Sequence, residues 1–233
     1  MTESGAYNAP MPNIDIAQFL YTLSYAAIPA IFAITVHEVA HGWVAKHCGD
    51  PTAAFAGRLT LNPIKHIDPI GTVLVPIALM LFTPFVFGWA KPVPVAFNNL
   101  DNPKRDMVLV AAAGPGVNLL MAFIWAAFGA LQFALISAMD VGSQWLLDMA
   151  GFGITINVVL AVFNMLPIPP LDGGRVLAGF APRGLANVLD QIEPFGIFIV
   201  LGLMITRVLW VIIEPPILFF TDFFYQVIQL GRI

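Results

Sequence analysis

The sequence has few charged residues and almost no cysteine. Only 10% of its 233 residues are Asp, Glu, Lys or Arg, whereas soluble proteins carry about 25%. The single cysteine, Cys48, excludes an internal disulfide and any metal site built from several cysteines. A net charge of −4 without a run of basic residues argues against nucleic acid as a partner. Residues 1–15 contain no Lys or Arg, so they lack the basic region of a cleavable signal and are expected to remain as a short polar leader.

Long apolar stretches are what the sequence has instead, with 59% hydrophobic residues. They predict an all-α polytopic membrane protein, a bundle of about five to six membrane segments in which residues 16–233 form a single integral-membrane domain. One of them, Met107–Met139, has 33 residues and is too long for one perpendicular crossing, so Gly114-Pro115-Gly116 is expected to break it. The uncharged stretches are Ile16–Val36, Pro69–Ala90, Met107–Met139 and Met149–Leu171, followed by a weaker one at Pro194–Ile213 and a short one at Pro215–Leu230.

The stretch Pro69–Ala90 is either a re-entrant hairpin or a kinked span. Its prolines and glycines disfavour a straight helix. The flanking loops, Lys46–Asp68 and Trp89–Asp106, each contain three Lys or Arg residues. Basic loops gather on the cytoplasmic side, and these two share a side only if the stretch between them enters the membrane and returns. We therefore favour re-entry.

The one motif with catalytic character is His37-Glu38-Val39-Ala40-His41, at the end of the first apolar stretch. On a helix, residues four apart lie on one face, so His37 and His41 are suited to bind one zinc ion. Glu38 then stays free to act as a general base. Ionisable residues at membrane depth are rare and indicate function.

A catalytic zinc ion usually has three protein ligands and an open position. His47 has the spacing of a third histidine, but a continuing helix would carry it about 15 Å from His37, and we interpret it as a solvated helix-end residue. Asp172 is a better candidate, because Pro167, Pro169 and Pro170 interrupt the helix before it and let a carboxylate point inward. From spacing alone, Asp172 could equally be a helix N-cap at the membrane edge.

Three segments together resemble the signatures of the site-2 protease family of zinc intramembrane metallopeptidases. They are His37 to His41, Gly114-Pro115-Gly116-Val117-Asn118, and Asn164 to Gly174 with its Leu-Asp-Gly. The sequences Gly57–Pro69 and Gly88–Val95 are similar to the compact prokaryotic branch, which lacks a PDZ or CBS module.

The resemblance implies a metallopeptidase domain with one Zn²⁺ ion per chain. His37, His41 and Asp172 would bind the metal, and Glu38 would activate water. Asn118 would bind substrate or stabilise the oxyanion, with Asn164 as a further substrate-binding residue.

The same resemblance implies a membrane-embedded β-hairpin at residues 69–90 and a role in regulated intramembrane proteolysis. The expected partners are a transmembrane protein substrate, the lipid bilayer of a prokaryotic cell membrane, and a regulatory membrane protein. His66 and Asp68 are interpreted as structural residues at the membrane interface, and an accessory role for them is left open.

Two other functions remain open from the sequence alone. A metal-ion transporter also places His and carboxylates at membrane depth, but it does not need an uncoordinated glutamate beside a ligand. A catalytically silent membrane scaffold would tolerate the loss of Glu38.

Overall fold

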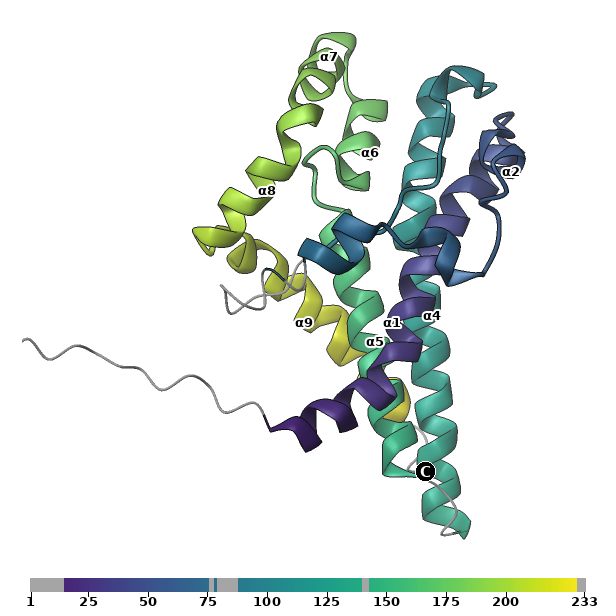
Figure 1. Cartoon of the computed structure of the whole chain (residues 1–233), viewed down its shortest axis with the longest axis vertical. Coiled ribbons are helices and arrows are strands. Elements are labelled where there is room, and N and C mark those ends of the chain that lie inside the picture. Colours follow the sequence, from purple (N-terminus) through teal and green to yellow (C-terminus); the bar gives the residue numbers. More distant parts are fainter. Residues whose placement is uncertain (1–14, 76–77, 79–87, 140–142, 230–233) are drawn as a thin grey trace, which may run out of the picture.

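The computed structural model describes residues 15–75, 78, 88–139 and 143–229, and in this part of the chain helices predominate and no strand occurs (Figure 1). The longer elements are α1 (Ile16–His47), α4 (Pro103–Met139), α5 (Gln144–Asn164), α6 (Asp172–Phe180), α7 (Arg183–Ile192), α8 (Gly196–Ile205) and α9 (Val208–Gln229). The short ones are α2 (Thr52–Phe55), η1 (Pro63–His66), η2 (Pro69–Leu74), η3 (Phe97–Asn99) and η4 (Glu193–Phe195).

Five helical segments are long and apolar enough to cross a membrane: Ile16–His47, Pro103–Ser137, Gln144–Asn164, Arg183–Ile205 and Val208–Gln229. This confirms the predicted all-α polytopic membrane fold. Large apolar side chains remain exposed along these helices, as expected where lipid is the solvent.

Helix α4 lies at the centre of the bundle and packs against α1, α5, α6 and α9. Small residues make this close packing possible: Ala122 and Ala126 of α4 are fully buried against Ile154 and Val158 of α5. A second core joins the end of α5 to α8 and α9 through Leu166, Val200, Met204, Leu209 and Ile213.

The expected break at Gly114-Pro115-Gly116 is wrong, because α4 continues through it with Pro115 inside the helix. Proline removes one backbone hydrogen bond, but neighbouring helices hold α4 along its length. At about 1.5 Å per residue, α4 is about 55 Å long and extends beyond the hydrocarbon core.

The expected boundary between the last two segments is also displaced. The chain breaks at Thr206 and Arg207, between α8 and α9, and Pro215 and Pro216 lie inside α9. Arg207 has φ of 61°, in the left-handed region that ends helices. The change of backbone conformation at Arg207, and not the two prolines, sets this boundary.

The two ends of the 69–90 stretch lie side by side. The Trp89 N–H donates to the Gly71 carbonyl at 3.0 Å, and the Lys91 N–H donates to the His66 carbonyl at 2.9 Å. The stretch therefore returns to where it began, as re-entry requires. The expected β-hairpin falls largely on residues 76–77 and 79–87, which are outside the described residues, and Pro69–Leu74 form a π-helix instead of a strand.

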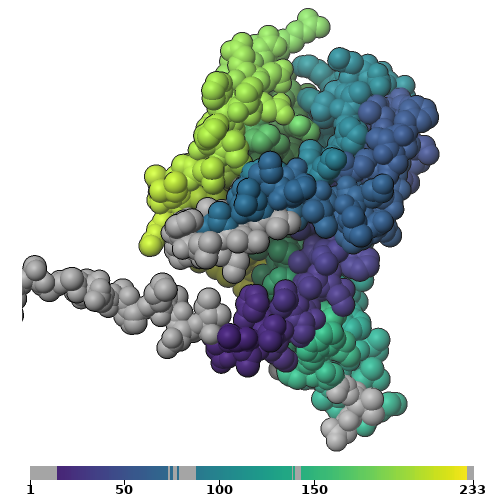
Figure 2. Space-filling view, viewed as in Figure 1, coloured from purple at the N-terminus to yellow at the C-terminus, as the bar shows by residue number. Residues whose placement is uncertain are grey.

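The space-filling view in Figure 2 shows the blue segment around η2 lying across the face of the bundle, between α8 and α1.

The basic loops on either side of this stretch lie at one end of the bundle (Figure 1). The Asp101 N–H donates to the Cys48 carbonyl at 2.8 Å, and Lys104 Nζ donates to the Ala181 carbonyl at 3.0 Å. Eight of the ten Lys and Arg residues belong to the three connections gathered there, 46–68, 89–106 and 172–193. The end of α4 and the start of α5 lie at the opposite end (Figure 1), and the sequence between Met139 and Gln144 contains no Lys or Arg.

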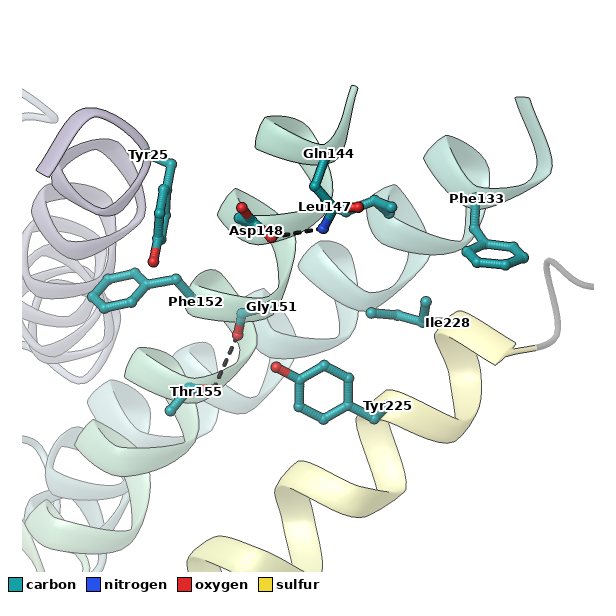
Figure 3. A pocket seen from close by; sticks show the side chains of 10 residues that line it. All are labelled: Tyr25, Phe133, Gln144, Leu147, Asp148, Gly151, Phe152, Thr155, Tyr225 and Ile228. Atoms are coloured by element: carbon teal, nitrogen blue, oxygen red, sulfur yellow. Dashed lines mark hydrogen bonds between the residues drawn. The ribbon is translucent and has the colours of Figure 1, made fainter. Parts of the chain in front are cut away.

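A cavity of about 460 Å³ lies among α1, α4, α5 and α9 near that opposite end (Figure 3). Asp148 is on its wall, where it accepts hydrogen bonds from the Tyr21 hydroxyl at 2.6 Å and from Gln144 Nε2 at 2.8 Å. Tyr25, also on the wall, precedes His37 by twelve residues, or about 18 Å of helix. The cavity is therefore separate from the His-Glu-x-x-His motif.

Candidate metal centre

Three potential metal ligands converge where α1 meets the start of α6. The Nε2 atoms of His37 and His41 are 3.1 Å apart. Asp172 Oδ2 is 3.3 Å from the first and 3.4 Å from the second. His37 and Asp172 are buried and His41 is half-buried. Among the described residues, these three form the group of His, Cys, Asp and Glu side chains whose ligand atoms lie close enough together, within 4.8 Å of one another, to hold one metal ion.

The spacing of the three atoms fits a tetrahedral zinc ion. Zinc–nitrogen and zinc–oxygen bonds of about 2.0–2.1 Å place tetrahedral ligands about 3.3–3.4 Å apart. Asp172 Oδ2 is buried and has no hydrogen-bond partner among the described residues. A cation between the three atoms would satisfy this orphaned oxygen, because an unpaired buried carboxylate is costly.

The other ring nitrogens of the two histidines fix which nitrogen faces the centre. His41 Nδ1 lies 2.7 Å from the Val110 carbonyl, which can only accept, so Nδ1 carries the proton. His37 Nδ1 lies 2.5 Å from Asn118 Oδ1, with the same result. Each Nε2 therefore presents a lone pair to the centre, as metal-binding imidazoles do.

Glu38 lies beside this centre and not in it. Its Oε2 accepts a hydrogen bond from the Val93 N–H at 2.8 Å. Prolines flank Val93 on both sides, so Val93 is the only donor among Pro92, Val93 and Pro94. The segment after the 69–90 stretch thus orients the carboxylate that the sequence predicts to be a general base.

Asp172 is the first residue of α6, and the residues before and after it fix its position. A Cβ at Gly173 would lie 2.2 Å from the Met165 carbonyl oxygen, and one at Gly174 would lie 2.5 Å from the Pro169 nitrogen. The start of α6 is folded tightly against the preceding turn, which requires both glycines. The proline-rich turn and the Gly-Gly pair together aim the Asp172 carboxylate at the two histidines.

Gly114 lets α4 pass directly over the two imidazoles. A Cβ at this position would lie 2.4 Å from His41 Nε2 and 2.7 Å from His37 Nε2, whereas a Cβ at Gly116 would meet nothing within 4 Å. The first glycine of the Gly-Pro-Gly sequence serves this close approach.

Gly114→Ala is expected to displace the imidazoles and weaken zinc binding by about tenfold or more, on the scale of other changes that disturb ligand orientation. Gly116→Ala makes the same chemical change two residues away and should keep wild-type affinity. Competition with a zinc chelator on the purified proteins measures both. Equal affinity of the two variants would contradict the proposed packing.

Asn118 is completely buried and has no amide hydrogen left for a substrate. Its Nδ2 donates to the Ala33 carbonyl at 3.2 Å and to Asn157 Oδ1 at 2.8 Å. In this arrangement both amide hydrogens are bonded within the protein, and a role of Asn118 in substrate binding or oxyanion stabilisation stays a prediction. The residue also contacts His37.

The remaining candidates make hydrogen bonds to groups other than the three ligands. Asn164 Nδ2 donates to the Leu160 carbonyl at 2.9 Å, and a role of Asn164 in substrate binding stays a prediction. His47 is exposed at the end of α1, and its Nδ1 lies 2.8 Å from the Trp43 carbonyl. His66 is buried, with Nε2 2.9 Å from the Thr60 carbonyl, and Asp68 caps η2 by accepting from the Ile70 and Gly71 N–H groups.

Asp50 also shapes the site, and sequence reasoning missed it. This fully buried carboxylate accepts hydrogen bonds from the Ala96 N–H at 2.7 Å, from Asn99 Nδ2 at 3.1 Å, and from the N–H and hydroxyl of Thr52. Burial alone would raise the pKa of Asp50, but these hydrogen bonds hold it below its usual value. Asp50 thereby ties the end of α1 to the segment that carries Val93. The Gly49-Asp50-Pro51 turn signal could have suggested a capping role, but not this partner.

Residues 25–205 match the model of peptidase family M50. The chain belongs to peptidase family M50. This confirms the resemblance to the site-2 proteases.

Relatives of this M50 chain occur in bacteria and archaea. "Putative zinc metalloprotease YwhC" of Bacillus subtilis is 40% identical over 83% of this chain and 89% of its own length. "Putative zinc metalloprotease MJ0611" of Methanocaldococcus jannaschii is 32% identical over 71% and 73%. "Putative zinc metalloprotease Rip2" of Mycolicibacterium smegmatis is 27% identical over 77% and 66%. No solved structure matches the chain.

Family membership and the five candidate spans together define the protein as a multi-pass membrane metalloprotease whose cofactor is zinc. These findings favour a metalloprotease over the two alternatives, a metal-ion transporter and a silent scaffold.

Proposed function

We propose that His37, His41 and Asp172 hold one zinc ion and that this M50 protease cleaves peptide bonds within or near the transmembrane segments of membrane proteins. The observation that carries the proposal is the convergence of three ligand atoms within 3.4 Å of one another, two of them on the candidate span α1, with the Glu38 carboxylate beside them and outside the group. His37 and His41 lie on the candidate span α1, and Gly114 of the candidate span α4 lies over them, so the site is suited to a substrate that is itself in the membrane.

Zinc in this site supplies a Lewis acid that polarises a carbonyl group and acidifies water. Glu38 takes a proton from the attacking water and gives it to the leaving amine. Because its Oε2 accepts from the Val93 N–H, Oε1 is the oxygen that carries this proton. The Val93 N–H keeps the carboxylate oriented during both transfers.

The substrate is a transmembrane protein that meets the enzyme in the lipid bilayer of a prokaryotic cell membrane. A membrane-spanning helix hides its peptide groups in its own hydrogen bonds, so the segment has to unwind locally before water can attack. We further propose that Asn164 contributes to binding the unwound segment and that another membrane protein controls access to the site.

A single-span reporter protein in liposomes tests the proposal. The zinc-loaded enzyme should cut it within or at the edge of the span, and mass spectrometry of the products locates the cut. Replacing a Leu-Leu pair near that position by Gly-Gly lowers helix propensity by about 2 kcal/mol, which should accelerate cleavage by up to about 30-fold.

The matched control is the same Gly-Gly change at the opposite end of the span, far from the cut, and it should have little effect. Cleavage confined to the soluble flanks, with no response to either pair, would contradict intramembrane proteolysis.

A further inference from the structure

Two fully buried asparagines connect three helices behind the proposed ligand His37. Asn118 of α4 and Asn157 of α5 are both 0% exposed. Asn118 Oδ1 lies 2.5 Å from His37 Nδ1, and Asn118 Nδ2 donates to Asn157 Oδ1 at 2.8 Å. Asn157 Nδ2 in turn donates to the Gly153 carbonyl at 2.8 Å. The hydrogen bonds thus run without interruption from the backbone of α5 to the imidazole on α1.

Backbone carbonyls fix the direction of this chain, because they only accept hydrogen bonds. The Gly153 carbonyl requires the NH₂ of Asn157, so the Asn157 oxygen faces Asn118. The Ala33 carbonyl likewise requires the NH₂ of Asn118. The Asn118 oxygen must then face His37, whose Nδ1 must carry the proton. The Nε2 lone pair is left to point at the centre.

The second histidine is held in another way. His41 Nδ1 donates directly to the Val110 carbonyl, with no side chain in between. A side-chain substitution at positions 118 or 157 therefore reaches His37 but leaves the Val110 bond in place. His41 is an internal control for any effect on His37.

We propose that Asn157 is a positioning residue for the metal centre: it orients the Asn118 amide, which in turn holds His37 in the tautomer and ring position that zinc requires. This inference rests on the proposed function, since it takes His37 as a zinc ligand. Partners of this kind tune zinc enzymes, where they commonly are carboxylates. A chain of two neutral amides does the same work without adding a charge among membrane-spanning helices.

Packing between spans is the alternative role for such asparagines, because interhelical hydrogen bonds are common in membranes. That role predicts a loss of stability without a specific effect on the metal. The two roles therefore differ in zinc affinity, and also in whether the effects at positions 118 and 157 depend on each other.

The test measures zinc affinity by chelator competition for the wild type, Asn118→Leu, Asn157→Leu and the double variant. Asn118→Leu should lower affinity by about 10- to 100-fold and Asn157→Leu by about 3- to 10-fold. The double variant should be no weaker than Asn118→Leu alone, because both changes interrupt one chain. Thr155→Val is the matched control: it removes the hydrogen bond from Thr155 Oγ1 to the Gly151 carbonyl on the same helix and should leave affinity unchanged.

A second readout follows the histidines directly. The sequence has only four, so histidine-specific ¹⁵N labelling of the zinc-loaded protein gives few signals. Asn157→Leu should shift or broaden the Nδ1–H signal of His37 and leave that of His41 in place. Asn157→Asp, which keeps an oxygen acceptor for Asn118, should lie closer to the wild type. Asn157→Ala removes the acceptor as Asn157→Leu does, and it replaces Asn157→Leu if the latter does not fold.

The outcomes separate this inference from the proposed function. Wild-type affinity in Asn157→Leu, additive losses in the double variant, or equal shifts of both histidines would overturn the role of Asn157 while the zinc site stands. No zinc binding by the wild-type protein would instead overturn the proposed function.

Discussion

Glu38→Gln is expected to keep zinc at near wild-type occupancy while slowing cleavage of a transmembrane reporter by about 10²- to 10⁴-fold. The carboxylate is not one of the three converging ligands, and its Oε2 accepts from the Val93 N–H. Glutamine has nearly the same shape and can keep that hydrogen bond through its amide oxygen. It cannot take a proton from water, so the change removes general-base catalysis alone.

Zinc content and reporter cleavage, measured on one preparation in liposomes, test this expectation. Glu38→Asp is the matched variant, since it keeps the base but withdraws it by one methylene group, and it should fall between Glu38→Gln and the wild type. The inactive enzyme should also trap uncut membrane proteins that crosslinking and mass spectrometry then identify. Cleavage by Glu38→Gln at the wild-type rate would show that another group moves the proton.

The fold was largely predictable because a membrane limits what a chain can do. The three strongest apolar stretches correspond to α1, α4 and α5, since only a helix satisfies the backbone of so long an uncharged run. The helical period alone places His37 and His41 on one face of α1. Loop charge also predicted that the 69–90 stretch returns to the side from which it starts.

The wrong predictions share a cause, because the effect of a local helix breaker depends on what packs around it. Pro115 lies inside α4, and Pro215 lies inside α9. Neighbouring helices hold α4 and α9 in place, and packing outweighs one missing hydrogen bond. Arg207 follows the end of α8 with a positive φ, and an arginine side chain does not predict that backbone conformation. Tertiary contacts that override propensity leave no sign in a single stretch of sequence.

Parts of the site could not be predicted because they depend on contacts between distant segments. Glu38 is oriented by a backbone N–H 55 positions away, which no side-chain pattern reveals. Asn157 is one polar residue in an apolar stretch, and such a residue usually indicates helix packing. The helix break before Asp172 suggested it as the third ligand, but its spacing alone suited a helix cap equally well, and the resemblance decided between the two.

Removing one zinc ligand is expected to weaken metal binding strongly and to reduce the stability that the metal confers. Structural zinc sites bind with about 10–16 kcal/mol over four ligands. Each ligand thus contributes about 3 kcal/mol, so His41→Ala should weaken zinc binding by about 100-fold or more. Asp172→Asn keeps an oxygen in place but loses the charge, so its affinity should lie between that of His41→Ala and that of the wild type.

Zinc that binds only the folded protein raises its unfolding temperature, and a chelator should remove this increase in the wild type. In His41→Ala the chelator should lower the unfolding temperature much less, because zinc that binds about 100-fold more weakly stabilises the folded protein less. His47→Ala is the matched control, since it removes an exposed imidazole from the same helix. It should keep both the zinc and the response to the chelator. A chelator response that survives in His41→Ala and disappears in His47→Ala would place the metal elsewhere on α1 and overturn the site formed with Asp172.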